Sequence, residues 1–440
     1  MSTGLTRSLA ELSSALEYEQ LPDDVVEIAR HCLLDWFGVT LGAADEPATA
    51  ILLLALRSAE GPATVVGHGN GYQALDAALI NGTASHALDF DDVSVAFLGH
   101  ASVAILPAAL ALAEQLDATA RELIAAFVAG YETVCRVARA LGPRPYVRGF
   151  HQTGTIGTIG AAAACAHLLE LDADATATAF GLASTQAAGL KCHFGTMAKP
   201  LHAGKACQNG LLAALLAADG FTANPDAIEA DQGLAALLGG GTDLDAALAD
   251  PRGRWHVRDN LFKYHASCFW THSMLEGIGD LVRSGAVQAD RIDHVEVHVS
   301  AIELGAAAIA EPTTALEVKY SLTHLAAMAL LKRPTSVIRD EDAHDPELIA
   351  LRAKITLVGD APPGPPTRVE VLQDGRTYTA QHEVAIPDRD LAAQQQRLTD
   401  KFASLAVPAL DNILAWDLLT TIVHLGPEHR VRELMMLARP

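Results

Sequence analysis

Two histidines and one lysine in glycine-containing segments are the first candidates for chemistry. His100 lies in GHAS, His151 in GFHQTG and Lys199 in FGTMAKPLHAG. Imidazole titrates near neutral pH and suits general acid–base work, and loops often carry functional residues. A lysine near the start of a helix adds its charge to the helix-terminal amides that attract carboxylate or phosphate. The pattern predicts acid–base chemistry on a small anion, and ordinary surface loops are the competing interpretation.

An acidic cluster lies between these segments. Asp89, Asp91 and Asp92 occur in LDFDDV. Three carboxylates could bind Mg²⁺, but the spacing of an EF-hand loop is absent. They could instead cap a helix, or one could orient a catalytic histidine. We favour an orienting role for Asp89 and expect no metal.

Several known motifs are missing. GKACQ at 204–208 departs from a phosphate-binding loop, which needs glycine where Lys199 stands and Ser or Thr where Ala206 stands. No GxGxxG follows an expected strand, and HExxH, paired CxxC and GxSxG motifs do not occur. We therefore expect no nucleotide cofactor and no zinc site of standard spacing.

Composition restricts the partners. The 440 residues carry a net charge of −22, which repels nucleic acid and anionic membranes, so an acid-binding site needs its own positive charge. The longest uncharged runs are too short to span a bilayer. Six scattered cysteines and an N-terminal segment unlike a signal peptide favour reduced thiols and a cytoplasmic location.

Hydrophobic periodicity predicts a mainly α protein with an α+β part. Half of the residues are hydrophobic, largely alanine and leucine, which is typical of helices packed through small side chains. We expect a large all-helical domain from both chain ends, residues 1–261 and 396–440, with a smaller α+β lid domain inserted at 262–395. In that domain Asp374-Gly375 is a hairpin turn signal, and Pro362–Pro366 reads as a stiff linker. In the helical part, Lys191–Lys205 is expected as a loop broken by Pro200, with a buried helix from about Lys205.

A second cationic segment begins at Lys263, in NLFKYHASCFWTH. One lysine with two histidines and Cys268 could form another wall of an anion site. A loop at the domain boundary, with Cys268 as a small buried residue, is the alternative.

Five motifs together resemble the MmgE/PrpD family, which includes 2-methylcitrate dehydratase, cis-aconitate decarboxylase and iminodisuccinate epimerase. They are LDWFGVTLGA (34–43), NGTASHALDFDD (81–92), RGFHQTGTIG (148–157), FGTMAKPLHAG (194–204) and KYHASCFWTH (263–272). The resemblance implies a helical domain, a lid domain, an active site between them, a homodimer, and no metal or organic cofactor.

Carried over by motif, the resemblance implies a set of site residues. The catalytic candidates are Asp89, His100, His151 and Lys199. The substrate-binding candidates are Lys263, Cys268, His324 and His202. Three departures concern the substrate side: Val93 replaces the usual threonine, the His100 loop is about one residue longer, and Cys268 and His324 stand where the decarboxylase has histidine and tyrosine.

The predicted function is a lyase that acts on a small polycarboxylate by moving a proton beside a carboxylate. Lys199 and Lys263 would stabilise the enediolate, and His100 and His151 would be acid and base, with Asp89 orienting His100. Dehydration and decarboxylation stay open. So do epimerisation of an amino- or imino-dicarboxylate such as iminodisuccinate, a non-catalytic carboxylate-binding protein, and a Mg²⁺-dependent enzyme.

Overall fold

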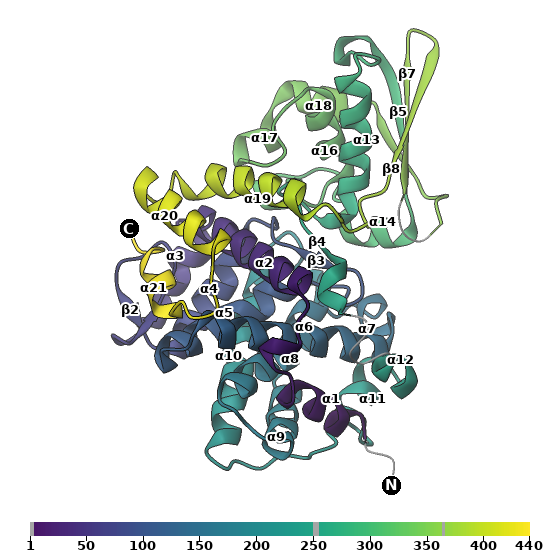
Figure 1. Cartoon of the computed structure of the whole chain (residues 1–440). Coiled ribbons are helices and arrows are strands. Elements are labelled where there is room, and N and C mark those ends of the chain that lie inside the picture. Colours follow the sequence, from purple (N-terminus) through teal and green to yellow (C-terminus); the bar gives the residue numbers. More distant parts are fainter. Residues whose placement is uncertain (1–3, 250–254, 363–365) are drawn as a thin grey trace. The chain divides into compact units, whose positions relative to one another are not determined.

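The chain divides into a helical unit and a mixed α/β unit in the computed structural model, which describes residues 4–249, 255–362 and 366–440 (Figure 1). The first unit comprises Met1–Cys192, Met197–Phe262 and Asp388–Pro440, and the second comprises His193–Thr196 and Lys263–Pro387. The prediction of a mainly α fold with a small α+β part is confirmed. Most of the predicted Pro362–Pro366 linker lies outside the described residues.

Helices are the main elements of the first unit. They are α1 (Leu5–Ser14), α2 (Asp23–Gly42), α3 (Pro47–Leu56), α4 (Ala74–Ala87), α5 (Ala101–Leu116), α6 (Ala120–Leu141), α7 (Arg144–Val147), α8 (Gln152–Leu168), α9 (Ala173–Ser184), α10 (Ala198–Ala218), α11 (Leu234–Leu238), α12 (Leu244–Leu248), α19 (Leu391–Ala406), α20 (Asn412–Val423) and α21 (Val431–Met436). Short strand pairs join β1 (Ala63–Thr64) to β2 (Gly71–Tyr72) and β3 (Val93–Ser94) to β4 (Asn260–Leu261). The 3₁₀ turns in the described ranges are η1 (Tyr18–Gln20), η2 (Lys191–His193), η3 (His256–Asp259), η4 (Phe269–Thr271) and η5 (Ala289–Arg291).

Helices α4 and α10 approach each other until their backbones touch. A Cβ atom added at Gly204 would lie 2.3 Å from the carbonyl oxygen of Leu79, and one added at Gly82 would lie 2.7 Å from the Cα of Gly204. Only glycine fits at such distances, because any side chain would overlap backbone atoms. This contact fixes the first turn of α10 close to the end of α4.

The start of α10 corrects one prediction. The helix begins at Ala198 rather than at about Lys205, so Lys199 and Pro200 lie in its first turn. The amide groups of a first turn have no partner within the helix, and a proline there removes no hydrogen bond. Pro200 therefore does not break the helix, and Lys199 stands on a rigid element.

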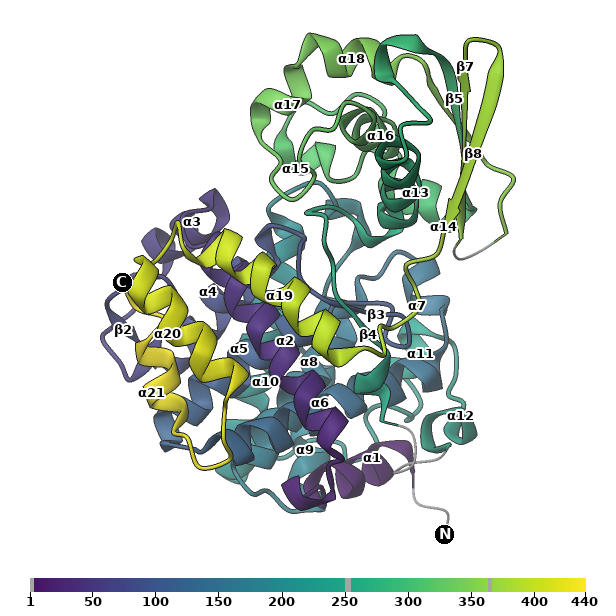
Figure 2. The ribbon, with the colours of Figure 1, turned by 45° about the horizontal axis from the view of Figure 1, so that its top comes forward.

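The C-terminal helices complete the first unit. Figures 1 and 2 show α19 and α20 beside α2. Lys401 of α19 forms a buried ion pair with Asp35 of α2, with 2.6 Å between Nζ and Oδ1, and also donates to the carbonyl oxygen of Phe90 at 2.6 Å. Helix α19 is thus linked through Lys401 to α2 and to the acidic loop that follows α4.

The second unit contains a four-stranded sheet in the order β6-β5-β7-β8. Its strands are β5 (Ile292–His298), β6 (Ile355–Val358), β7 (Thr367–Gln373) and β8 (Arg376–His382), and its helices are α13 (His272–Arg283), α14 (Ala301–Ala307), α15 (Ala315–Val318), α16 (Leu322–Leu330), α17 (Asp340–His344) and α18 (Pro346–Arg352). The predicted hairpin is confirmed, since Asp374 and Gly375 join β7 to β8 with φ angles of 50° and 74°. Val295 and Val297 of β5 are fully buried in the core, while Glu296 between them points to the other face.

Among the described residues, no single helix is both long and apolar enough to cross a membrane. Helices α2 and α3 meet the length and composition criteria only as a pair, with a bend of 81° between them.

Replacing Gly204 with alanine tests the α4–α10 contact. The new methyl group would overlap Leu79 and Thr83, so we expect a loss of about 1–3 kcal/mol in the free energy of unfolding. Gly305→Ala in α14 is the matched control, because nothing lies within 4 Å of its Cβ position and alanine favours a helix. Urea denaturation should show Gly204→Ala destabilised and Gly305→Ala unchanged or stabilised, and equal curves would contradict the close contact.

Candidate active site

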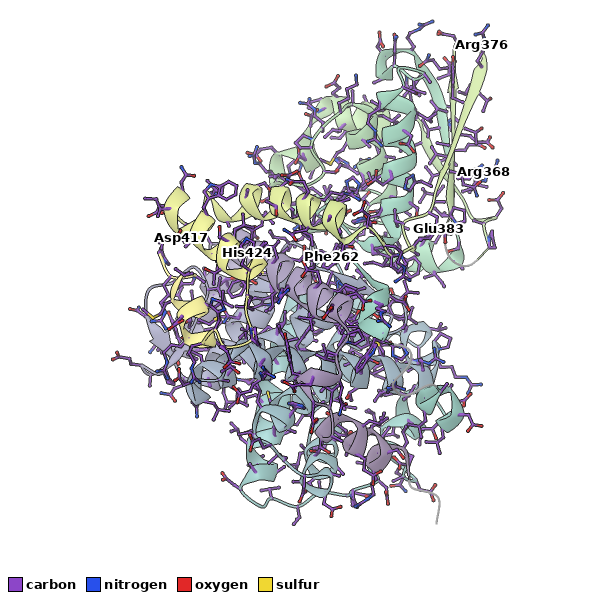
Figure 3. The ribbon with its side chains drawn as sticks, in the orientation of Figure 1. Phe262, Arg368, Arg376, Glu383, Asp417 and His424 are labelled. Carbon is purple, nitrogen blue, oxygen red and sulfur yellow. The ribbon has the colours of Figure 1, made fainter. Side chains whose placement is uncertain are left out.

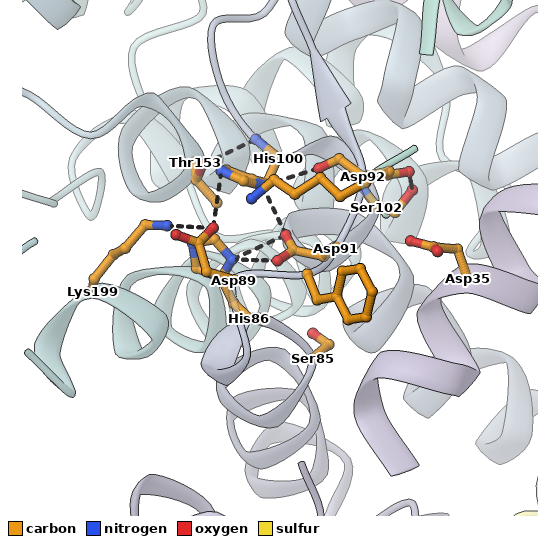
Figure 4. A network of polar contacts seen from close by, with 12 residues as sticks. Asp35, Ser85, His86, Asp89, Asp91, Asp92, His100, Ser102, Thr153 and Lys199 are labelled. Carbon is orange, nitrogen blue, oxygen red and sulfur yellow. Dashed lines mark hydrogen bonds and ion pairs between the residues drawn. The ribbon is translucent and has the colours of Figure 1, made fainter. Parts of the chain in front are cut away.

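The ends of four helices meet at a buried polar cluster in the first unit (Figure 4). His100 is the N-cap residue of α5 and His151 that of α8, and Lys199 lies in the first turn of α10. His86 stands in the last turn of α4, with Asp89 just beyond it. Three positively polarised helix N-termini therefore point to one region, which favours negative charge there.

Asp89 and Lys199 form a buried ion pair. Lys199 Nζ lies 2.9 Å from Asp89 Oδ1, and their side chains are 5% and 4% exposed. Asp89 has a φ angle of 51°, a left-handed conformation that aspartate tolerates better than most residues. Because both groups are buried, each charge is compensated by the other, and removal of one partner leaves an uncompensated charge in the interior.

Asp91 bridges two imidazole rings. Its Oδ2 lies 2.9 Å from His86 Nδ1 and 2.8 Å from His100 Nδ1. The same His100 nitrogen donates to the carbonyl oxygen of Asp92 at 2.9 Å, so its proton lies on Nδ1. The Nε2 atom of His100 then faces Asp89 Oδ1 across 4.0 Å. Asp89 was predicted to orient His100; in the structure Asp91 contacts Nδ1 of that ring, and Asp89 lies opposite Nε2.

Burial keeps the neighbouring histidines neutral. Loss of hydration lowers the pKa of His86 to about 3, although Asp91 opposes this shift. Burial, together with the charge of Lys199, holds the pKa of His151 well below its usual value. Burial alone would raise the pKa of Asp91, but His86 and His100 hold it well below its usual range. Asp91 is therefore an anion between two rings.

His151 and His202 face each other through their Nδ1 atoms at 3.0 Å. One of these atoms donates and the other accepts, so the tautomers of the two rings are linked. His151 also stacks on His86, with 5.7 Å between ring centroids and 18° between ring planes. The structure thus brings His202 into contact with the predicted catalytic histidine.

Asp92 belongs to a separate part of the network. Its carboxyl group accepts from the hydroxyl of Ser102 and, at 3.0 Å, from Asn260 Nδ2. Burial and the nearby Asp35 raise the pKa of Asp92 to about 7. This carboxyl group is therefore largely protonated in weakly acidic solution.

A possible metal-ligand set differs from the predicted one. Ligand atoms of four buried residues lie within 4.8 Å of one another: His86, Asp89, Asp91 and His100. Asp92 is not part of the set, although it was one of the three carboxylates weighed for Mg²⁺. Lys199 already supplies a positive charge to Asp89 at this place.

Three predicted substrate-binding residues belong to the second unit. Lys263 is fully buried and donates to the carbonyl oxygen of Ser267 at 3.1 Å, and Cys268 is 7% exposed in the core. His324 is fully buried; its Nε2 donates to the carbonyl oxygen of Asp342 at 2.9 Å, and its Nδ1 lies 3.3 Å from Arg352 Nη1. Both ring nitrogens of His324 are thus engaged within the unit.

Neither the place of His86 in this cluster nor the contacts of Asp91 with His86 and His100 were predicted from the sequence. His86 precedes Asp91 by five residues, across the end of α4. This spacing could have indicated the contact, because a chain that turns back at the end of a helix brings DFDD close to a histidine in the last helical turn. The left-handed backbone conformation of Asp89, by contrast, could not be predicted from the sequence.

The fold and site define a protein with buried imidazole–carboxylate pairs beside a lysine, an arrangement for acid–base chemistry on an anion. The chain belongs to the MmgE/PrpD family: the N-terminal domain of the family matches residues 7–247 and the C-terminal domain matches residues 265–415. This confirms the resemblance found in the sequence.

Several relatives carry the name cis-aconitate decarboxylase. The protein of Aspergillus terreus (strain NIH 2624 / FGSC A1156) is 27% identical over 86% of this chain and 81% of its own length. The Mus musculus and Homo sapiens proteins are 26% and 24% identical, each over 96% of this chain and 91% of its own length. These likenesses support an enzyme of the lyase class.

Asp92→Asn should change how stability depends on pH. In the unfolded chain Asp92 has its ordinary pKa near 3.8, so the folded state keeps a proton that the unfolded chain releases. The free energy of unfolding therefore falls as pH rises from about 4 to 7. Asparagine lacks this titration. From pH 5 to pH 8, we therefore expect the free energy of unfolding of the variant to rise by about 2–3 kcal/mol relative to that of the wild type.

Urea denaturation of both proteins at these two pH values measures the difference between their free energies of unfolding. The contributions of the other titrating groups cancel in this difference. The exposed Asp293→Asn is the control. A constant difference between wild type and Asp92→Asn would show that Asp92 is already ionised at pH 5.

Proposed function

We propose that this chain is a lyase that moves a proton beside a carboxylate of a small polycarboxylate, in a dehydration or a decarboxylation. The single observation that carries the proposal is the buried Asp91–His100 pair next to Lys199. The names of the relatives add support for the substrate class. Independence of cofactors and a homodimer belong to the same proposal and rest on the family resemblance. A cytoplasmic location is also proposed, and it rests on the six scattered cysteines.

Lys199 is the proposed stabiliser of negative charge. Removal of a proton beside a carboxylate spreads charge onto the carboxylate oxygens as an enediolate. A fixed ammonium group in a site that excludes water stabilises this charge more strongly in the transition state than water would. Lys199 stands on the first turn of α10, whose amide groups add to the same field.

His100 is the proposed proton-transfer group. Its Nδ1–H is held by Asp91 and by the carbonyl oxygen of Asp92, so Nε2 can accept a proton. The imidazolium that forms is stabilised by the Asp91 carboxylate, as in other histidine–aspartate pairs. His151 is neutral and lies 6.4 Å from His100 between ring centroids, which suits a second proton donor or acceptor.

The substrate then decides the outcome. With a β-hydroxyl group, the electron pair of the broken C–H bond forms a double bond, and hydroxide leaves with a proton from an imidazolium. With a carboxylate positioned for loss, the C–C electron pair stays on carbon as CO₂ leaves, and an imidazolium protonates that carbon. Without either group, return of the proton on the opposite face gives epimerisation, and binding without turnover would indicate a carboxylate-binding protein.

A metal-dependent enzyme is the second candidate, and the buried set of His86, Asp89, Asp91 and His100 favours it. A divalent ion there would compete with Lys199 for Asp89. Activity that persists in EDTA would exclude this candidate, and activity restored only by added metal would replace the first proposal.

Lys199→Met tests the proposed charge stabilisation. Methionine keeps most of the volume but no charge, and we expect the turnover number to fall by about 10²–10³-fold. The assay is proton NMR in D₂O with cis-aconitate, citrate, 2-methylcitrate and imino-diacids, which detects deuterium beside a carboxylate and loss of water or CO₂. Lys205→Met is the matched control, since Lys205 is exposed on the same helix.

Near-normal turnover of Lys199→Met would contradict the assignment. Because the ion pair with Asp89 is buried, a loss of about 3–5 kcal/mol in stability is also expected, so folding is checked by circular dichroism.

Asp91→Asn tests the proposed histidine–aspartate pair. An amide cannot stabilise the imidazolium and favours the wrong tautomer, so we expect the turnover number to fall by about 10³–10⁴-fold while KM changes little. The control is the exposed Asp293→Asn. A change confined to KM would assign Asp91 to substrate binding instead.

A further inference from the structure

One face of the sheet in the second unit gathers carboxylates around a histidine. The antiparallel pairing of β5 with β7 sets Glu296 directly opposite Glu370 and His298 opposite Arg368. Since side chains two residues apart point to the same side of a strand, all four lie on one face. Figure 3 shows Arg368 and Arg376 along the β7–β8 hairpin. Two like charges directly opposite each other destabilise a sheet unless something compensates them.

His298 lies at the centre of this face. Its side chain is 8% exposed, and its Nδ1 lies 2.8 Å from Asp360 Oδ1. Its Nε2 is buried and has no hydrogen-bond partner within the described part of the chain. That atom lies 3.8 Å from Glu296 Oε2 and 3.9 Å from Glu370 Oε1. A buried nitrogen thus faces two carboxylates at distances too long for hydrogen bonds.

The charges on this face do not balance. Three carboxylates, those of Glu296, Glu370 and Asp360, surround His298. Among the described residues, the only permanent cation in contact with them is Arg368, which pairs with Glu370. Arg368 Nη2 also lies 2.9 Å from His298 Nδ1, but that nitrogen can satisfy only one neighbour. The Asp360 carboxylate is the stronger partner, because both groups can carry charge. This places the proton on Nδ1 and leaves the lone pair of Nε2 toward the two glutamates.

We propose that His298, Glu296 and Glu370 bind a divalent transition-metal ion, with Zn²⁺ as the simplest case. The three ligand atoms lie within 4.8 Å of one another. In a tetrahedral zinc site with bonds of about 2.0–2.1 Å, ligand atoms are about 3.4 Å apart, so small rotations of the glutamates complete the set. Water would occupy the fourth position. Two positive charges would balance the excess of two negative ones.

The surroundings of His298 match those of a metal ligand. A metal-binding histidine usually donates its other ring nitrogen to a carboxylate, which fixes the tautomer and the ring orientation, and Asp360 occupies that position. A proton in place of the metal would leave Nε2–H at 3.8 Å and 3.9 Å from its acceptors, without a hydrogen bond. The glutamates are 44% and 27% exposed, so an ion can enter from solvent.

This inference is independent of the proposed lyase activity, since none of its residues is among the proposed catalytic or substrate-binding residues. Bound metal would join the C-terminal part of β5 to β7 and would stabilise the sheet.

The test is calorimetric titration of the chelator-treated full chain with Zn²⁺, repeated with Co²⁺, whose visible absorption reports tetrahedral geometry. We expect His298→Ala to lose one equivalent of bound metal and the absorption that belongs to it. His294→Ala is the matched control: His294 lies on the same strand, with Nε2 3.9 Å from Glu296, and is 41% exposed. It should keep the full stoichiometry.

The set around His86 could contribute its own equivalent, so the comparison counts only the equivalent that depends on His298. Glu370→Gln serves as a second variant, with nearly unchanged volume, and decides the matter if His298→Ala fails to fold. Asp360→Asn should keep the stoichiometry and weaken the affinity by about 10–100-fold.

Three outcomes would overturn the proposal. They are no zinc binding by the wild type, equal binding by the wild type and the folded variants of His298 and Glu370, and an equal loss in His294→Ala and His298→Ala.

Discussion

The buried ion pair of Lys199 with Asp89 is the interaction on which the first unit depends. Both groups are almost fully removed from solvent, so water cannot compensate either charge. The pair forms only when the first turn of α10 lies against the end of α4. The helix ends that meet there, those of α5 and α8 included, are constrained by the same requirement. Electrostatics thus fixes the site, and packing makes that arrangement possible.

The packing follows from small residues. Leucine and alanine make helices, but the glycines at 82 and 204 decide how closely two of them approach. A helix pair with larger residues at these positions would stand farther apart, and a lysine on one would no longer reach an aspartate that follows the other. The close contact and the buried charge pair therefore belong together.

Much of the fold was predictable, because hydrophobic periodicity and turn residues act locally. The hairpin turn at Asp374-Gly375 lies where it was predicted. The start of α10 was not predicted, since proline is compatible with a first helical turn as well as with a loop.

The site was predictable in its residue types but not in its pairing. His100, His151 and Lys199 were named from motifs, and the structure brings them to one cluster in the first unit. The choice between Asp89 and Asp91 as the partner of His100 depends on one left-handed residue, whose direction no spacing reveals. His202 contacts His151 through a turn of α10 that was expected as a loop. The places of Lys263, Cys268 and His324 in a substrate site stay predictions.

The link from Lys401 to Asp35 and to the carbonyl oxygen of Phe90 has a consequence for the order of folding during synthesis. The second unit is almost continuous in the chain, from Lys263 to Pro387, and its core is complete before α19 leaves the ribosome. The first unit begins earlier but lacks the lysine that holds its acidic loop until nearly the last residues are made. Domains usually complete their folding in the order of their synthesis. In this chain the part synthesised first reaches its final form last, and a ribosome that stops before Lys401 releases an intact second unit with an unfinished first one.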